Sequence, residues 1–150
     1  MKWLKVIKIL AFPRLKKAAR QEYQPFLNQS PMEDMLVVSH TLHRQTYQWL
    51  RKFKTPQYGR MWLLRKKKAF NTLFFQQPYD VVVCDRYGNV LATFVALGSG
   101  YVSNYYRAGY FIYFMVVGSI KFYDIRPSDR LTFKRLLPSL QILQDLMGLK

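Results

Sequence analysis

The sequence predicts a single α+β domain, with a compact, mainly antiparallel β-sheet or barrel-like body and flanking N- and C-terminal helices. Short apolar runs bounded by turn residues recur from residue 35 onward, which is typical of strands. One of them, Tyr110 to Val117, carries no charge and indicates the most buried strand. Apolar residues at helical spacing occur instead near the two ends. At 150 residues the chain fits one domain.

We expect two parts: residues 1–30, a basic amphipathic segment with a linker, and residues 31–150, a single β-rich domain with a C-terminal helix. Residues 2–12 place lysines at every third position on one side of a helix and apolar residues on the other. Pro13 ends or kinks this pattern. The helix could lie on an anionic bilayer, or it could pack on the domain with its lysines in solvent. The sequence leaves both alternatives open.

Within the body, the predicted elements follow the apolar runs in order. Residues 21–31, with Pro25, Asn28, Ser30 and Pro31, predict a linker. The later elements are a strand at 35–39, a helix within 40–54, a turn at 55–59, a strand at 61–64, a strand at 81–83, a strand at 90–97, the strand at 110–117, a strand within 130–136 and a helix from Ser139. The 90–97 run lacks polar alternation, so we expect both its faces to be covered. Asp85 to Asn89 predicts a hairpin turn, with Gly88 at positive φ.

Charge is the strongest functional signal. The chain carries 24 Lys and Arg against 8 Asp and Glu, a formal charge of +16, and residues 1–68 hold 16 of the cations with three carboxylates. Such an imbalance favours an anionic membrane surface, an acidic protein or nucleic acid as partner. The residues expected to contact the anion are Lys2, Trp3, Lys5, Lys8, Arg14, Lys16, Lys17 and Arg20, with the run Arg65, Lys66, Lys67 and Lys68.

The sequence predicts a cytoplasmic protein, peripheral on the inner face of the membrane in the first of the two alternatives above. Lys5 and Lys8 interrupt the apolar start, so it does not fit a secretory signal. No apolar run approaches the ~20 residues of a spanning helix. The single cysteine, Cys84, lies among valines, which indicates a buried, inert thiol.

Six short motifs resemble the small prokaryotic family catalogued as domain of unknown function 192. They are Gly59-Arg60-Met61-Trp62, Asn71-Thr72, Pro78-Tyr79-Asp80, Asp85-Arg86-Tyr87-Gly88, Gly118-Ser119-Ile120 and Ser128-Asp129-Arg130-Leu131. The chain departs from the family pattern at Phe114, where a glutamate is usual, and at Ser128, where a glycine is usual. The resemblance implies a compact, mainly antiparallel fold and no established activity.

No catalytic constellation is recognisable, and we expect no catalytic residue, cofactor or metal. An enzyme would use Asp80 as an acid or base, but turns and strand starts explain every carboxylate from residue 80 to 129. His40 and His43 lack further ligands nearby and are expected at the surface. Asn71, Thr72 and Asp80 could line a pocket, although we favour backbone hydrogen bonding for Asn71 and Thr72.

These observations predict a non-enzymatic accessory or binding module at an anionic membrane surface. The alternative is nucleic-acid binding, in which residues 44–68 supply the charge and tyrosines supply stacking surfaces. The tyrosines are Tyr101, Tyr105, Tyr106 and Tyr110.

Overall fold

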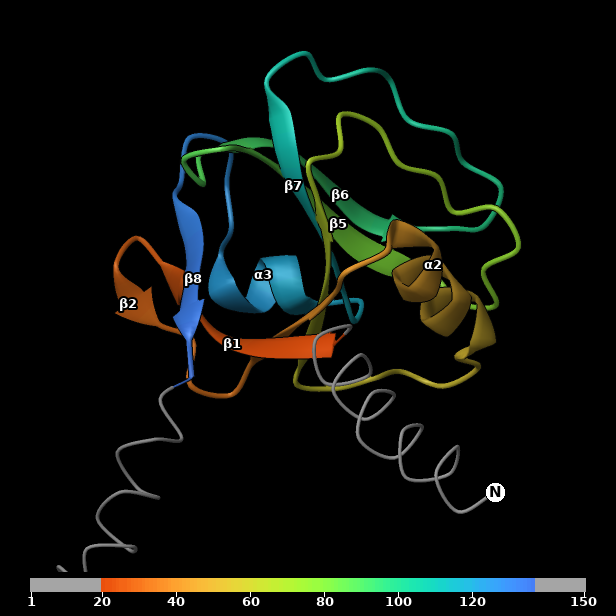
Figure 1. Cartoon of the computed structure of the whole chain (residues 1–150), viewed down its shortest axis with the longest axis horizontal. Coiled ribbons are helices and arrows are strands. Elements are labelled where there is room, and N and C mark those ends of the chain that lie inside the picture. The colour runs from red at the N-terminus through yellow and green to blue at the C-terminus, as the bar shows by residue number, and fades with distance from the viewer. Residues whose placement is uncertain (1–19, 137–150) are drawn as a thin grey trace, which may run out of the picture.

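The computed structural model describes residues 20–136, and these form one curled sheet with two short helices (Figure 1). The strands follow the order β2-β1-β3-β4-β7-β5-β6, and β8, outside this order, also pairs with β1. The strands are β1 (Arg20–Leu27), β2 (Ser30–Pro31), β3 (Leu36–His40), β4 (Arg60–Arg65), β5 (Tyr79–Asp85), β6 (Val90–Leu97), β7 (Gly109–Met115) and β8 (Leu131–Arg135), and the helices are α2 (His43–Lys52) and α3 (Ser119–Tyr123). The predicted β-rich, mainly antiparallel body is therefore confirmed.

Two apolar layers hold the sheet together because its central strands send alternate side chains to opposite faces. In β5, Val82 and Cys84 join the layer that contains β1, β8 and α3, whereas Val81 and Val83 join the layer under α2. Figure 1 shows α3 inside the curl and α2 outside it. Both layers cover β5, and its central residues Val81 to Cys84 form a continuous apolar run that is buried on both faces.

The curl nearly closes where the β5–β6 turn meets the start of β8. Asn89 and Arg130 form an isolated bridge there, and the Leu131 amide donates to the Gly88 carbonyl at 2.8 Å. Gly88 has φ +89°, and a Cβ on it would lie 2.6 Å from the Leu131 carbonyl oxygen. Only glycine therefore fits both the turn and this approach. The predicted turn is confirmed, with Asp85 Oδ1 accepting from the Tyr87 amide at 2.8 Å.

Two sequence predictions about the strands are wrong. The expected linker at 21–31 instead forms β1 and β2, and β1 pairs with both β3 and β8, so the sheet includes these residues. The strand at 90–97 is not covered on both faces, since β6 lies at the sheet edge and Val95 is 64% exposed. By contrast, the burial predicted for the 110–117 run is observed in β7, where Ile112 to Met115 are inaccessible.

The two helices of residues 20–136 lie within the chain and do not flank the sheet at its termini. Helix α2 matches the pattern predicted within 40–54, whereas α3 was not predicted. The helices expected at 2–12 and from Ser139 lie outside the described residues. Among the residues that are described, no helix has the length and apolar character to cross a membrane.

Candidate anion-binding site

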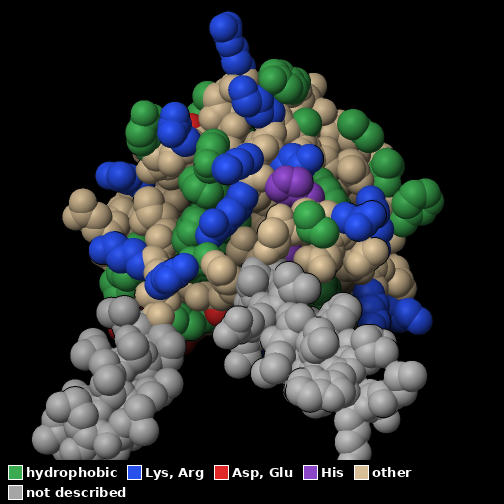
Figure 2. All heavy atoms as spheres, viewed as in Figure 1, with side chains coloured by type: hydrophobic (Ala, Val, Ile, Leu, Met, Phe, Trp, Pro, Cys, Tyr) green, Lys and Arg blue, Asp and Glu red, His purple; other side chains and the backbone are tan. Residues whose placement is uncertain are grey.

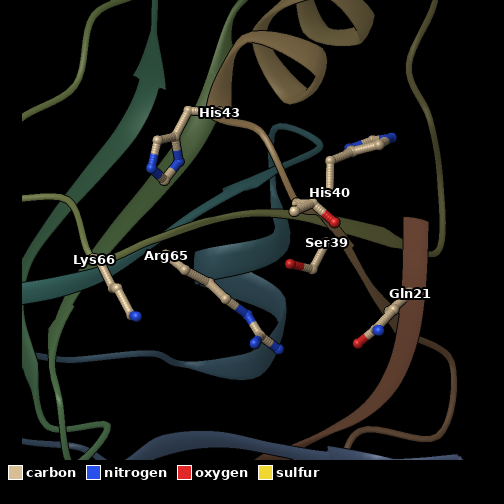
Figure 3. A pocket seen from close by; sticks show the side chains of 7 residues that line it. Gln21, Ser39, His40, His43, Arg65 and Lys66 are labelled. Carbon is tan, nitrogen blue, oxygen red and sulfur yellow. The ribbon is translucent and has the colours of Figure 1, made fainter. Parts of the chain in front are cut away.

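The parallel pairing of β3 with β4 creates the candidate site. Parallel strands end at the same edge of a sheet, so the chain leaves β3 at His40 beside the point where it leaves β4 at Arg65. Strand β1 runs antiparallel to β3 and pairs Gln21 with Ser39, which adds its first residues to this edge. A cavity of about 280 Å³ opens here, lined by Gln21, Ser39, His40, Thr41, His43, Arg65 and Lys66 (Figure 3).

Arg65 is held in place by aromatic rings and not by a carboxylate. Its guanidinium carbon lies 5.0 Å from the centre of the Tyr23 ring and 5.1 Å from that of Phe133. The Nε atom is buried and has no hydrogen-bond partner among residues 20–136. Cation–π contacts orient a guanidinium without neutralising it. Arg65 therefore presents an uncompensated positive charge to the cavity.

Gln21 and Ser39 add neutral donors to the same space. The Tyr23 hydroxyl donates to Gln21 Oε1, which fixes the side-chain amide and leaves its NH₂ group without an intramolecular acceptor in the described part of the chain. The Ser39 side chain is 5% exposed and borders the cavity. In Figure 3 the Gln21 side chain extends toward the Arg65 guanidinium with its amide oxygen nearest, and the Ser39 hydroxyl lies close to them in the view.

The two histidines beside the cavity are neutral at physiological pH. Burial, followed by the charge of Arg20, lowers the pKa of His40; burial, followed by the charge of Lys67, lowers the pKa of His43. His40 Nδ1 lies 3.1 Å from Thr46 Oγ1, and Figure 3 shows its ring turned away from Arg65. His40 is 8% exposed, so the prediction that it lies at the surface is wrong.

The charged residues that line the cavity are the cations Arg65 and Lys66. In this part of the chain the one ion pair joins Arg126 to Asp124 at 2.9 Å, and both side chains are exposed. No Asp or Glu lines the cavity. Figure 2 shows Lys and Arg over much of this face, with both histidines among them and little acidic surface. Arrangements of this kind attract anions.

Two paired loops carry both exposed apolar side chains and the cations Lys66, Lys67 and Lys68. The loop after β4 lies along the loop after β6 through an Asn71–Val102 bridge and a 3.0 Å bond from the Ser103 amide to the Phe70 carbonyl. Figure 1 shows them side by side at the rim. Three large apolar side chains of these loops are mostly exposed, namely Phe74 (80%), Val102 (66%) and Tyr105 (70%). Lys68 Nζ lies 5.9 Å from the centre of the Tyr105 ring.

Thr72 ties these loops together and does not face a ligand. Its hydroxyl donates to the Gly98 carbonyl at 2.7 Å and accepts from the Tyr101 amide at 3.0 Å. Asn71 Oδ1 accepts from the Leu73 amide at 3.0 Å. Both side chains form hydrogen bonds with backbone groups, which is the role favoured from the sequence.

Asp80 is fully buried at the start of β5. Its Oδ1 accepts from the Ala96 amide at 2.8 Å, and its Oδ2 accepts from the Gly118 and Ile120 amides, each at 3.0 Å. Thr72 binds the Gly98 carbonyl, so Thr72 and Asp80 both contact the end of β6, and both do so through hydrogen bonds to the backbone. These bonds account for the structural role of Asp80.

The described residues give little support for metal binding or for a nucleophilic thiol. No group of three His, Cys, Asp or Glu in residues 20–136 could hold a metal ion. Cys84 is inaccessible, and burial raises the pKa of its thiol, which disfavours the nucleophilic thiolate.

Of the other residues predicted from the sequence, some lie near the cavity and others lie outside the described residues. Arg20 lies 6.0 Å from the centre of the Trp62 ring, near the cavity. The six cations from Lys2 to Lys17, with Trp3, lie outside the described residues. Tyr101 packs on Phe70 and Phe94, so Tyr105 is the one strongly exposed member of the tyrosine set. The sequence analysis missed Gln21 and Ser39, and no local signal marks them, since only the strand pairing brings them to the cavity.

Comparison with known proteins establishes the fold and goes no further. No family model matches the chain, and no curated protein is significantly similar to it in sequence. Among solved structures, the chain is similar to a "putative transcription regulator" from Sinorhizobium meliloti 1021, with 13% identity and a TM-score of 0.65 over 78% of this chain and 97% of that one. It is also similar to a protein of unknown function from Novosphingobium aromaticivorans DSM 12444, with 10% identity and a TM-score of 0.51 over 75% of this chain and 84% of that one.

Proposed function

We propose that this chain is a non-enzymatic accessory module that docks on an anionic membrane surface at the cytoplasmic side. The observation that carries the proposal is that the Lys66–Lys68 run and the exposed side chains of Phe74, Val102 and Tyr105 lie on the same two paired loops, where Lys68 contacts the Tyr105 ring. Peripheral membrane surfaces combine these two features, because apolar side chains enter the headgroup region while cations contact lipid phosphates.

The backbone of Phe74 supports a binding role for its side chain. Phe74 occupies the third position of a β-turn closed by the Phe75 amide and the Thr72 carbonyl at 3.2 Å, and its φ is +65°. A glycine or asparagine is usual at such a position. A bulky residue there costs ~1 kcal/mol, and an exposed ring regains little of this by burial. Burial of the ring in a bilayer interface would offset this backbone cost.

The N-terminal cations would add to the same attraction. Each Lys or Arg near an anionic bilayer contributes ~1 kcal/mol, and the strength falls as salt screens it. Residues 2–17 lie outside the described structure, so their contribution rests on the amphipathic pattern alone.

We also propose that the chain is a divergent member of the domain of unknown function 192 family. Support comes from how its motif residues serve the fold. Asp80 of the Pro-Tyr-Asp motif binds the amides of Gly118 and Ile120 in the Gly-Ser-Ile motif, and Asp85 forms the turn that Gly88 completes. Motifs that hold one another in place are expected to recur as an ordered set.

Nucleic-acid binding remains the second candidate, and the contact of Lys68 with Tyr105 favours it specifically. A cation beside an exposed tyrosine can hold a phosphate while the ring stacks on a base. Stacking platforms usually present several rings, whereas Tyr101 is packed against Phe70 and Phe94 here. The membrane proposal uses the apolar Phe74 and Val102 as well, so we place it first.

Vesicle flotation tests the proposal. The full chain should float with vesicles containing phosphatidylglycerol and remain unbound with phosphatidylcholine alone. Phe74→Ser and the double change Lys67→Gln with Lys68→Gln should each reduce binding about tenfold, and removal of residues 1–19 should reduce it further. Phe122→Ser and Lys121→Gln are matched controls, because Phe122 is 76% exposed and lies on α3.

Equal losses in the loop and control variants would contradict the docking surface. Absent vesicle binding, combined with salt-sensitive retention on single-stranded nucleic acid, would favour the second candidate instead.

A further inference from the structure

We propose that the cavity at the ends of β3 and β4 is a specific site for a phosphate monoester group, bound by Arg65, Lys66, Ser39 and the Gln21 amide. This inference does not rest on membrane docking. It concerns a single small anion in a defined cavity, whereas docking concerns the exposed loop tips.

The donors come from three different strands or their ends and meet at one opening. Gln21 belongs to β1, Ser39 to β3 and Arg65 to β4, and Lys66 follows β4 directly. A phosphate monoester presents three terminal oxygens, which can accept from a guanidinium, an ammonium and neutral N–H or O–H groups at the same time. The cavity supplies all of these donor types.

No negatively charged side chain lines the cavity, so none would repel an anion. Its lining contains no carboxylate, and the His43 imidazole carries no negative charge in either protonation state. The Oε1 of Gln21 is occupied by the Tyr23 hydroxyl, which leaves the NH₂ side for a ligand. The arrangement is therefore set to donate hydrogen bonds.

Arg65 is oriented before any ligand arrives. The rings of Tyr23 and Phe133 hold the guanidinium, whose Nε is buried without a partner in the described residues. A pre-oriented guanidinium loses little conformational entropy on binding, and its planar fork can bind two phosphate oxygens at once. A lysine here would keep the charge and lose the fork.

The volume sets the size of the ligand. At about 280 Å³ the cavity is at the lower limit of small-molecule pockets, so it suits a phosphate with a short ester arm. The same chemistry exists in a free phosphate compound and in a lipid headgroup such as phosphatidate. The site would recognise the shared group, and the experiment must separate the two sources.

Titration of the full-length protein with inorganic phosphate, followed by amide NMR and calorimetry, tests the site. Chemical shifts should change first at Gln21, Ser39 and His43. Ser39→Ala and Arg65→Lys should each weaken phosphate binding about tenfold, because each removes hydrogen bonds to a charged ligand. Lys121→Gln should leave it unchanged, since this exposed residue lies on α3. Sulfate at equal charge and chloride at equal ionic strength are the anion controls.

Vesicles separate the two sources. If Arg65→Lys abolishes a preference for phosphatidate over phosphatidylglycerol at equal surface charge, the site takes a lipid headgroup. If the wild type shows no such preference but binds inorganic phosphate through the cavity, the site takes a soluble compound. Shifts spread over all surface lysines, or equal phosphate affinity in Arg65→Lys, Ser39→Ala and Lys121→Gln, would overturn the proposal. If a cavity variant loses phosphate binding but still floats with phosphatidylglycerol vesicles, the docking proposal remains intact.

Discussion

The carboxylate of Asp80 binds the backbone amide of Ile120, 40 residues further along the chain, at 3.0 Å. The same oxygen accepts from Gly118, so Asp80 satisfies amides at the start of α3, which has no side-chain cap of its own. Its other oxygen binds the Ala96 amide at 2.8 Å. One buried side chain therefore joins β5, the end of β6 and α3.

Asp80→Asn should destabilise the fold by about 3 kcal/mol. An amide has one acceptor oxygen, so its NH₂ group would face a backbone N–H at one of the three contacts. Urea unfolding measures the loss, with Asp34→Asn as the control because Asp34 is exposed. Equal midpoints for the two variants would show that Asp80 does not organise α3.

Thr72→Val should cost about 2 kcal/mol, because it removes both hydroxyl hydrogen bonds while keeping the shape of the side chain. Amide hydrogen exchange at Tyr101 should accelerate, since that amide donates to Thr72 Oγ1. Thr72→Ser retains the hydroxyl and should behave nearly as the wild type. Unchanged exchange in Thr72→Val would mean that the two loops are held by other contacts.

The stabilisation provided by Asp85 should disappear in acid. Burial acts to raise the pKa of Asp85, but hydrogen bonds from the Asn89 side chain and from the Asn89, Tyr87 and Gly88 amides outweigh it and lower the pKa below its usual value. A lowered pKa gives stability above the unfolded value of about 4 and loses it as pH falls through the folded value. The free-energy difference between wild type and Asp85→Asn should therefore shrink below about pH 4. A constant difference down to pH 2 would contradict this.

His40 should make the fold sensitive to a milder fall in pH. Burial, and then the Arg20 charge, lowers its pKa below the unfolded value of about 6.5. The unfolded chain then binds the proton more readily, so stability is full above pH 6.5 and falls as pH drops toward the folded pKa. Urea midpoints at pH 7.5 and 5.0 should differ less in His40→Gln than in the wild type. His43 remains in the variant, so its own titration is common to both proteins.

Phe74→Gly should leave the fold as stable as the wild type or stabilise it by up to about 1 kcal/mol, because glycine adopts φ +65° without strain. Its neighbour Phe75 provides the contrast, since it is buried and Phe75→Gly should cost about 4 kcal/mol. Thermal unfolding of both variants checks this. A large loss in Phe74→Gly would show that the ring supports the fold.

Local patterns predicted the elements whose partners are close in sequence. The Asp85–Gly88 turn depends on a side chain that binds its own neighbours, so the residues alone identified it. Strand β1 was missed because Pro25 and its polar residues resemble a linker, while its partners β3 and β8 lie far apart along the chain. Helix α3 was missed because Asp80 holds its start from another strand.

The amino-acid sequence alone determined the excess of positive charge, the β-rich class and the basic run at residues 65–68, since these follow from composition and local periodicity. Tertiary structure decided which donors share a cavity and which apolar tips lie beside the cations. Ser39 and Arg65 meet because β3 and β4 are parallel, and parallel pairing depends on long-range contacts that no local pattern records.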